Sequence, residues 1–172
     1  MVLNDVRIRE MVKNGYISNC LNDMVNPASI NIRLDGTFAK LPPKEYIMLG
    51  EELEYEPSDL PFGRIGPGEF LLASTMEEFD LPNDISAFVQ GRSSIGRIGL
   101  SIQNAGFVDP GFHGHITLEL KNETTATIML PYGYPVGQLV FFDTDLVEKG
   151  YDGKYNGQNR ATGSRMHLDK GW

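Results

Sequence analysis

Alternation of apolar and polar residues with a period of two is the feature of this sequence that most limits its fold. In SINIRL (29–34) and in HITLELK (115–121), apolar residues occupy every second position. Such spacing predicts strands with one buried face. Further short strands are predicted over 70–73, 86–89, 127–130 and 138–142.

Turn signals separate the predicted strands. They are Asp35-Gly36, Pro67-Gly68, Pro82-Asn83, Pro110-Gly111 and the segment from Pro131 to Pro135. Before the first strand, Asn4 or Asp5 is suited to cap a short helix that ends at Gly15. Many short strands at nearly regular spacing favour a mainly β fold, namely a β-sandwich, a jelly roll or a barrel.

The composition is that of a single globular domain with an ordinary core. The chain has 172 residues, of which 41% are apolar and 22% are charged. No apolar run approaches the roughly 18 residues that a transmembrane helix requires, and the first fifteen residues carry scattered charges where a signal peptide is apolar. Because Cys20 is the single cysteine, it has no internal disulfide partner, and we expect a cytoplasmic protein.

The net charge of −8 is concentrated in one segment. Residues 51–80 carry nine acidic residues and one basic residue, Arg64. An acidic chain is poorly suited to DNA, RNA or an anionic membrane, so we expect none of these as partners. A small anionic ligand remains compatible, because it needs only a local basic pocket.

Several common catalytic signatures are missing from the sequence. With three histidines and one cysteine, the chain lacks the H-x-E and P-C-x-x-C motifs of zinc deaminases. It also contains no G-x-x-x-x-G-K-[ST] phosphate loop and no G-x-S-x-G elbow.

Two segments contain residue types suited to binding a phosphorylated ligand. GRSSIGRIG (91–99) combines two arginines, two adjacent serines and glycines, which suit phosphate oxygens. The alternative is a strand-to-turn junction with solvated arginines. The tail, with Tyr151, Lys154, Tyr155 and Gln158, is either a flexible terminus or a lid that orders over a bound anion.

Two carboxylates are candidates for proton transfer. Asp109 precedes a Pro-Gly turn, so its carboxylate either accepts the turn's hydrogen bond or faces a ligand. Glu119 lies on the polar face of the strand predicted over 115–121. If that face is open to solvent, Glu119 is an ordinary surface acid; if it lines a cleft, burial raises its pKa and makes it a general acid and base.

Taken in order, these segments resemble the dCTP deaminase family of the dUTPase-like superfamily. The matching pieces are NPASINIRLDG (26–36), PGEFLLASTMEEFDLP (67–82), GRSSIGRIGL (91–100), AGFVDPGFHGHITLELKN (105–122), PVGQL (135–139) and YDGKYNGQ (151–158). The ordered combination of GRSS-x-x-R, FVDPG, ITLEL and GKYxxQ is much more specific than any one of its parts.

The resemblance implies a distorted jelly roll that assembles as a homotrimer with active sites between subunits. It implies a β domain over residues 1–145 and a flexible C-terminal lid over residues 146–172. The implied substrates are dCTP and dUTP. The implied cofactor is Mg2+ bound through the substrate triphosphate, without zinc.

The resemblance also assigns roles to individual residues. Glu119 matches the glutamate that carries protons from the attacking water to the cytosine ring and the leaving ammonia, and Arg97 matches the arginine that orients it. Ser93 and Ala105 match the groups that position this water. Asp109 matches the acid that contacts the deoxyribose 3′-hydroxyl. The implied nucleotide-binding residues are Arg92, Ser93, Ser94, Ile95, Gly96, Arg97, Asp109, Thr117, Leu118, Glu119, Gln138, Tyr151, Lys154 and Gln158.

The short run into AGFVD (105–109) is similar to the family members that also release pyrophosphate. It also resembles the G-V-I-D segment of true dUTPases, in which the aspartate matched by Asp109 helps to activate the water for attack on phosphate. We therefore expect conversion of dCTP to dUMP at a single site. The alternatives are a deaminase that stops at dUTP, a plain dUTPase, and a nucleotide-responsive regulatory protein without turnover.

Overall fold

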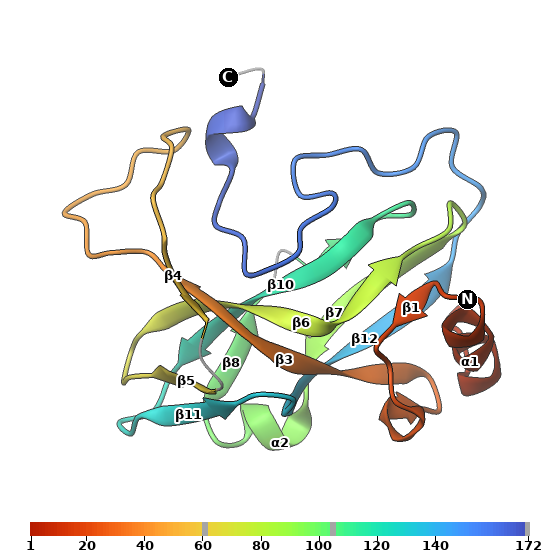
Figure 1. Ribbon diagram of the computed structural model, residues 1–172, viewed down its shortest axis with the longest axis horizontal. Helices are drawn as coiled ribbons and strands as arrows, with labels where there is room; N and C mark the ends of the chain where they lie inside the picture. The colour runs from red at the N-terminus through yellow and green to blue at the C-terminus, as the bar shows by residue number, and fades with distance from the viewer. Residues whose placement is uncertain (60–61, 104–105, 171–172) are drawn as a thin grey trace.

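The computed structural model describes residues 1–59, 62–103 and 106–170 as a mainly β fold with a short N-terminal helix (Figure 1). The helical elements are α1 (Asp5–Lys13), η1 (Asn22–Met24), α2 (Ser93–Gly96) and η2 (Met166–Leu168). Asn4 caps α1 through its side chain, which accepts a hydrogen bond from the Arg7 amide, as the sequence predicts. None of the described helices is both long and apolar enough to cross a membrane.

The strands form one large curled sheet and one small two-stranded sheet. Their bounds are β1 (Ile17–Ser18), β2 (Val25–Asn26), β3 (Ser29–Lys40), β4 (Glu56–Asp59), β5 (Phe62–Ile65), β6 (Phe70–Asp80), β7 (Ile85–Gly91), β8 (Leu100–Gln103), β9 (Phe107–Val108), β10 (His113–Asn122), β11 (Ile128–Pro131) and β12 (Pro135–Asp143). The large sheet has the antiparallel order β8-β10-β6-β3-β12-β7-β9. Strand β1 pairs with β6, strands β2 and β4 pair with β3, and β5 and β11 form the small two-stranded sheet.

The two ends of the large sheet lie near each other in space. Strands β8 and β9 are the first and last along the pairing order, yet only residues 104–106 separate them in the chain. An extended connection of that length spans at most about 14 Å, so the sheet must curl around its own core. This closure is what gives the jelly-roll architecture expected from the resemblance.

The core lies inside this curled sheet and follows the predicted alternation in β10. Ile116, Leu118 and Leu120 are buried, whereas Thr117 and Glu119 point to the opposite face and are half-buried. The other predicted strands also form, within β6, β7, β11 and β12. Mutual burial of these apolar faces supplies the main drive for folding.

Strand β3 departs from the sequence prediction in two ways. Its polar positions are not open to solvent, because Asn31 and Arg33 are buried along with the apolar residues. Asp35-Gly36 is not a turn between strands but an irregularity inside β3, where the register with β6 shifts. The Asp35 carboxylate accepts hydrogen bonds from Thr37, and Gly36 has φ of 83°, so the local turn chemistry makes a bulge here instead.

Candidate active site

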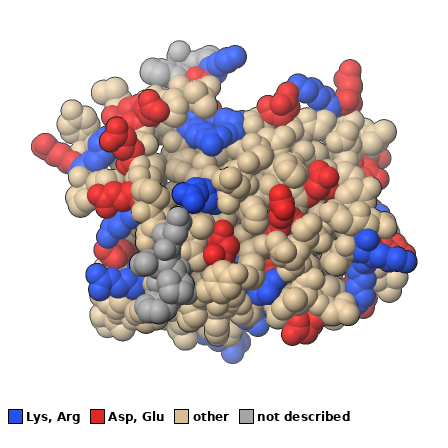
Figure 2. Space-filling view, viewed as in Figure 1, with Lys and Arg blue, Asp and Glu red and all other residues tan. Residues whose placement is uncertain are grey.

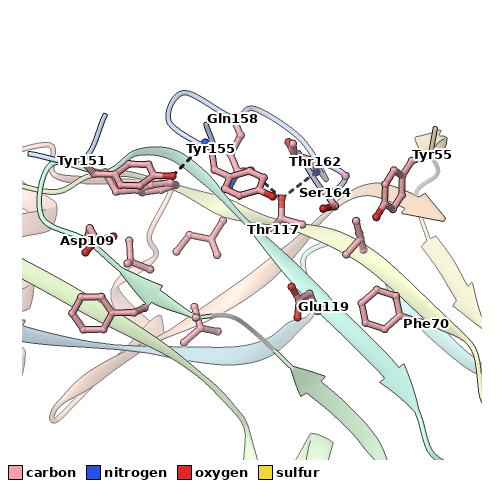
Figure 3. Close-up of a pocket in the computed structure, with 18 residues that line it drawn as sticks. Tyr55, Phe70, Asp109, Thr117, Glu119, Tyr151, Tyr155, Gln158, Thr162 and Ser164 are labelled. Atoms are coloured by element: carbon pink, nitrogen blue, oxygen red, sulfur yellow. Dashed lines mark hydrogen bonds between the residues drawn. The ribbon is translucent and has the colours of Figure 1, made fainter. Parts of the chain in front are cut away.

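A cavity of about 420 Å³ lies between β10 and the C-terminal segment (Figure 3). Strand β10, β6 and the turn before β10 form its floor, and residues 151–164 form its roof. Its labelled lining residues are Tyr55, Phe70, Asp109, Thr117, Glu119, Tyr151, Tyr155, Gln158, Thr162 and Ser164. The polar face of β10 therefore lines a cavity that is partly open to solvent, which answers the question that the sequence left open for Glu119.

Burial makes the Glu119 carboxyl easier to protonate than that of a surface glutamate. The side chain is half-buried, and this desolvation raises the pKa of its carboxyl above the ordinary value. Directly opposite, Leu72 of β6 pairs with Glu119 in the antiparallel register, and the Phe70 ring lies beside it. An apolar neighbourhood of this kind disfavours the charged form, so the carboxyl holds a proton more readily than a surface glutamate.

The first part of the C-terminal segment is held against the start of β10 by backbone hydrogen bonds. The His115 amide donates to the Gln158 carbonyl at 2.8 Å, and the Gly157 amide donates to the His113 carbonyl at 2.8 Å. Gly114 permits this approach, because an added Cβ there would lie 2.6 Å from the Gln158 oxygen. These contacts place the predicted lid in a closed position, while its flexibility stays a prediction.

Thr117 links the floor of the cavity to its roof. The Thr162 amide donates to the Thr117 hydroxyl at 3.1 Å, and that hydroxyl lies 3.2 Å from Oε1 of Gln158. Since Oε1 is an acceptor, the Thr117 hydroxyl donates to it. Gln158 is buried by this arrangement, so two predicted ligand residues, Thr117 and Gln158, meet directly.

Asp109 and Tyr151 lie at the other end of the cavity. The Tyr151 amide donates to the Pro110 carbonyl at 2.7 Å, and the Tyr151 ring packs against Phe112 with centroids 6.0 Å apart. Asp109 is exposed at the cavity mouth. The structure thus brings Asp109, Thr117, Glu119, Tyr151 and Gln158 to one cavity, as the resemblance implies.

Lys154 lies on the lid but outside the cavity lining. Its ammonium pairs with the Asp169 carboxylate, which raises the pKa of Lys154, and lies 5.4 Å from the centroid of the Tyr155 ring. A phosphate bound by Lys154 would compete with Asp169 for the ammonium. The Tyr155 amide in turn donates to the Tyr151 hydroxyl at 3.3 Å.

The GRSSIGR segment lies away from this cavity, around α2 on the opposite side of the sheet from the lid (Figure 1). Ser93, Ser94, Gly96 and Arg97 are exposed there, and the Ile95 side chain is buried. Nη1 of Arg92, just before α2, donates to the Pro135 carbonyl at 2.9 Å. One chain therefore does not bring the predicted Arg97 and Glu119 together.

Two further predicted residues, Leu118 and Gln138, also fall outside the cavity lining. Leu118 is fully buried in the core on the far face of β10, so only its backbone is available to flank a base. Gln138 accepts a hydrogen bond from the Ser29 hydroxyl at 3.1 Å. Ala105 lies outside the described residues.

Sequence reasoning missed several residues that line the cavity. Phe70 follows from the pairing of β6 with β10, which no local pattern reveals. Tyr55 comes from the acidic segment and carried no signal. Thr162 and Ser164 lie beyond the last matched motif, and only their contacts in the folded chain bring them to the cavity.

Comparison with known proteins identifies the family. The dCTP deaminase-like domain matches residues 2–144, which is most of the chain. The chain belongs to the dCTP deaminase-like family. A family member from a Sulfurihydrogenibium species, named "dCTP deaminase, dUMP-forming", is 40% identical over an alignment of 183 positions, which covers 99% of each chain. A protein of the same name from Aquifex aeolicus is 40% identical over 99% of this chain and 97% of its own.

A solved structure supports the fold of this family member. The crystal structure of 2′-deoxycytidine 5′-triphosphate deaminase from Agrobacterium tumefaciens superposes with a TM-score of 0.68 over 81% of this chain, at 23% identity. The match spans 47% of that longer chain. At this identity the likeness establishes a shared fold.

Proposed function

We propose that the protein is a dCTP deaminase of the dUMP-forming kind. The observation that carries this proposal is Glu119, a half-buried carboxyl with a raised pKa in a cavity that Asp109 also lines. Its near full-length relatives at 40% identity carry that name. A plain dUTPase would have no base proton to move and no use for Glu119.

In the proposed deamination, Glu119 takes a proton from a water that attacks carbon 4 of cytosine. The carboxyl passes this proton to ring nitrogen 3, and a tetrahedral centre forms at carbon 4. A second transfer through Glu119 moves the remaining hydroxyl proton to the amino group, the carbon–nitrogen bond breaks and ammonia leaves, which gives dUTP. A carboxyl with a raised pKa suits both proton transfers, because the same group must accept each proton and then return it.

In the proposed second step, Asp109 accepts a proton from another water that attacks the α-phosphorus. The bond between the α-phosphorus and the bridging oxygen breaks, and pyrophosphate leaves with that oxygen. The products of both steps are dUMP, pyrophosphate and ammonia from dCTP and two waters. The roof formed by residues 151–164 favours this chemistry because it limits the access of bulk water and so strengthens the hydrogen bonds within the site.

We propose that Mg2+ enters with the substrate, bound to phosphate oxygens and water, where it neutralises phosphate charge. Across the described ranges 1–59, 62–103 and 106–170, no group of three or more His, Cys, Asp and Glu side chains is placed to hold a metal ion. The phosphates would meet the residues that the resemblance implies, Lys154 among them.

We further propose a homotrimer in which a neighbouring subunit supplies the α2 segment to each site. This is supported by the placement of Arg97 and Ser93, which are exposed on the far side of the sheet from Glu119. A symmetric ring of copies can present such a surface to the cavity of the next copy. We also infer a cytoplasmic location, because the half-buried Cys20 is a free thiol and suits a reducing compartment.

Product analysis of the wild-type protein and Glu119→Gln tests the proposed function. With dCTP and Mg2+, the wild type is expected to release dUMP, pyrophosphate and ammonia in equal amounts, and Glu119→Gln to release no ammonia. The matched control is Glu123→Gln, because Glu123 is exposed just beyond β10 and should be dispensable. Undiminished ammonia release by Glu119→Gln would rule out the assigned role.

The same assay separates the alternatives. Accumulation of dUTP by the wild type indicates a deaminase that stops after the first step. Cleavage of dUTP with dCTP untouched indicates a plain dUTPase. Binding of either nucleotide without any product indicates a regulatory protein.

A further inference from the structure

The roof of the cavity has a second part beyond the matched lid motif, which we call the strap and define as residues 161–164. The Ala161 amide donates to the Thr37 hydroxyl, and the Thr162 amide donates to the Thr117 hydroxyl, each at 3.1 Å. Two strands, β3 and β10, therefore each hold the strap through a threonine. The backbone hydrogen bond from His115 to the Gln158 carbonyl is separate from these anchors, whereas the Thr117 hydroxyl also donates to the Gln158 side chain.

The strap is also held by packing against its own small cluster of side chains. Ala161 is buried in a small cluster with Ala39 and Leu72, separate from the main core, and Tyr55 packs against this cluster. At Gly163, an added Cβ would lie 2.3 Å from a ring carbon of Tyr55. The Tyr55 ring therefore lies directly on the strap backbone, where only glycine leaves room.

Tyr55 reaches the strap from the acidic arm, which we define as residues 41–55 between β3 and β4. Figure 2 shows acidic side chains gathered over this arm, at the left of the view. The arm and η2 lie side by side in Figure 1, and the His167 ring lies 3.8 Å from the Glu52 carboxylate. The arm thus meets the C-terminal segment both at Tyr55 and at η2.

The contact between Tyr55 and the strap lies at the Glu119 end of the cavity. Leu72, in the cluster under Tyr55, is the residue paired with Glu119 across β6 and β10. Figure 3 shows the Tyr55 side chain directed toward the same end of the cavity as Phe70 and Glu119. Removing the ring would expose this end of the cavity to solvent and leave the strap held only by its hydrogen bonds and by Ala161.

We propose that Tyr55 is a positioning residue for the reaction, which holds the strap over Glu119 and keeps the carboxyl poorly hydrated during proton transfer. This inference rests on the proposed function, because it assigns Glu119 the proton transfer. Tyr55 acts through packing, so it touches the strap and the wall of the cavity, not the reacting atoms. The triphosphate is expected to bind elsewhere, at the residues of the lid motif and α2.

Kinetics of Tyr55→Ala with dCTP and Mg2+ test the inference. Loss of the ring is expected to lower kcat about ten-fold or more, because proton transfer typically contributes at least that much. KM for dCTP is expected to stay within about two-fold, because the phosphate contacts are separate. Gly163→Ala is expected to reproduce the loss, because its Cβ overlaps the Tyr55 ring and displaces the strap.

The pH profile distinguishes this role from a merely structural one. Among the described residues, the ionisable groups that line the cavity with Glu119 are Asp109, Tyr55, Tyr151 and Tyr155. Lys121 is the next residue on the same face of β10, and its ammonium donates to the Gly68 carbonyl. Glu119 must be ionised to accept the first proton, so kcat rises with pH through its raised pKa. Hydration of Glu119 in Tyr55→Ala lowers that pKa, and the acidic limb of the kcat profile shifts to lower pH.

Two variants keep the inference falsifiable. Tyr55→Phe retains the ring and is expected to keep the wild-type kcat and pH profile, whereas Tyr46→Ala removes an exposed tyrosine of the same arm and should change neither. Equal loss in Tyr55→Phe and Tyr55→Ala, or an unshifted acidic limb in Tyr55→Ala, overturns the inference. Wild-type protein that forms no product from dCTP would instead overturn the proposed function.

Discussion

The buried ion pair between Arg33 and Glu77 offers the sharpest test of how this sheet is held together. Glu77 is fully buried on β6, and Arg33 on β3 is 8% exposed. Oε1 of Glu77 lies 2.7 Å from Nε of Arg33, and Oε2 accepts the Arg33 backbone amide at 2.8 Å. The guanidinium also donates to the carbonyl of Asn19, so each charge is matched by several hydrogen bonds.

Replacing Glu77 by alanine leaves the buried Arg33 guanidinium and its backbone amide without their acceptor. Breaking a buried pair by removing one partner costs about 3–5 kcal/mol of unfolding free energy. For a chain of this size each kcal/mol lowers the melting temperature by about 2–4 °C, so we expect a fall of roughly 6–20 °C. Circular dichroism melts at one fixed protein concentration measure it, because assembly makes melting temperature depend on concentration.

The matched control is the ion pair between Lys40 and Glu69, which joins partly exposed side chains that are 43% and 41% exposed. Glu69→Ala is expected to cost less than about 1 kcal/mol, because solvent already screens both charges. The double variant Arg33→Met with Glu77→Leu should regain most of the loss in Glu77→Ala, because neither charge is then buried alone. Equal melting temperatures for Glu77→Ala and Glu69→Ala would refute the reasoning.

Two further predictions concern assembly and the free thiol. If Arg97 and Glu119 of one site come from different subunits, the inactive variants Arg97→Ala and Glu119→Gln should complement each other. After the two proteins are unfolded, mixed in equal amounts and refolded together, about a quarter of the sites should be intact and dCTP turnover should return. Absence of turnover in the mixture would contradict shared sites. Burial raises the pKa of the Cys20 thiol to about 11, with Glu77 contributing. Alkylation of Cys20 by a thiol reagent at about pH 8 should therefore be far slower than that of a small free thiol. Equal alkylation rates for the two thiols would contradict this burial.

Local patterns in the sequence were enough to predict the strands and the side of β10 on which Glu119 lies. Period-two spacing is a property of neighbouring residues, so the burial of Ile116 and Leu118 follows from it directly. The same local logic misjudged Asp35-Gly36, because a bulge and a turn share the chemistry of a glycine with positive φ beside a hydrogen-bonding carboxylate. It also misjudged Arg33, whose burial depends on a partner 44 residues away.

The site depends on contacts that no local pattern contains. The motifs pointed to Glu119 and Gln158, yet only the pairing of the C-terminal segment with β10 makes that face a cavity and raises the pKa of Glu119. Tyr55 enters because an irregular arm folds back onto Gly163. Whether a segment forms a strand, and which of its faces is buried, depends on residues close together in the chain, so the sequence alone predicts it. Enclosure is set by register, sheet curvature and packing between distant segments, which only the tertiary structure decides.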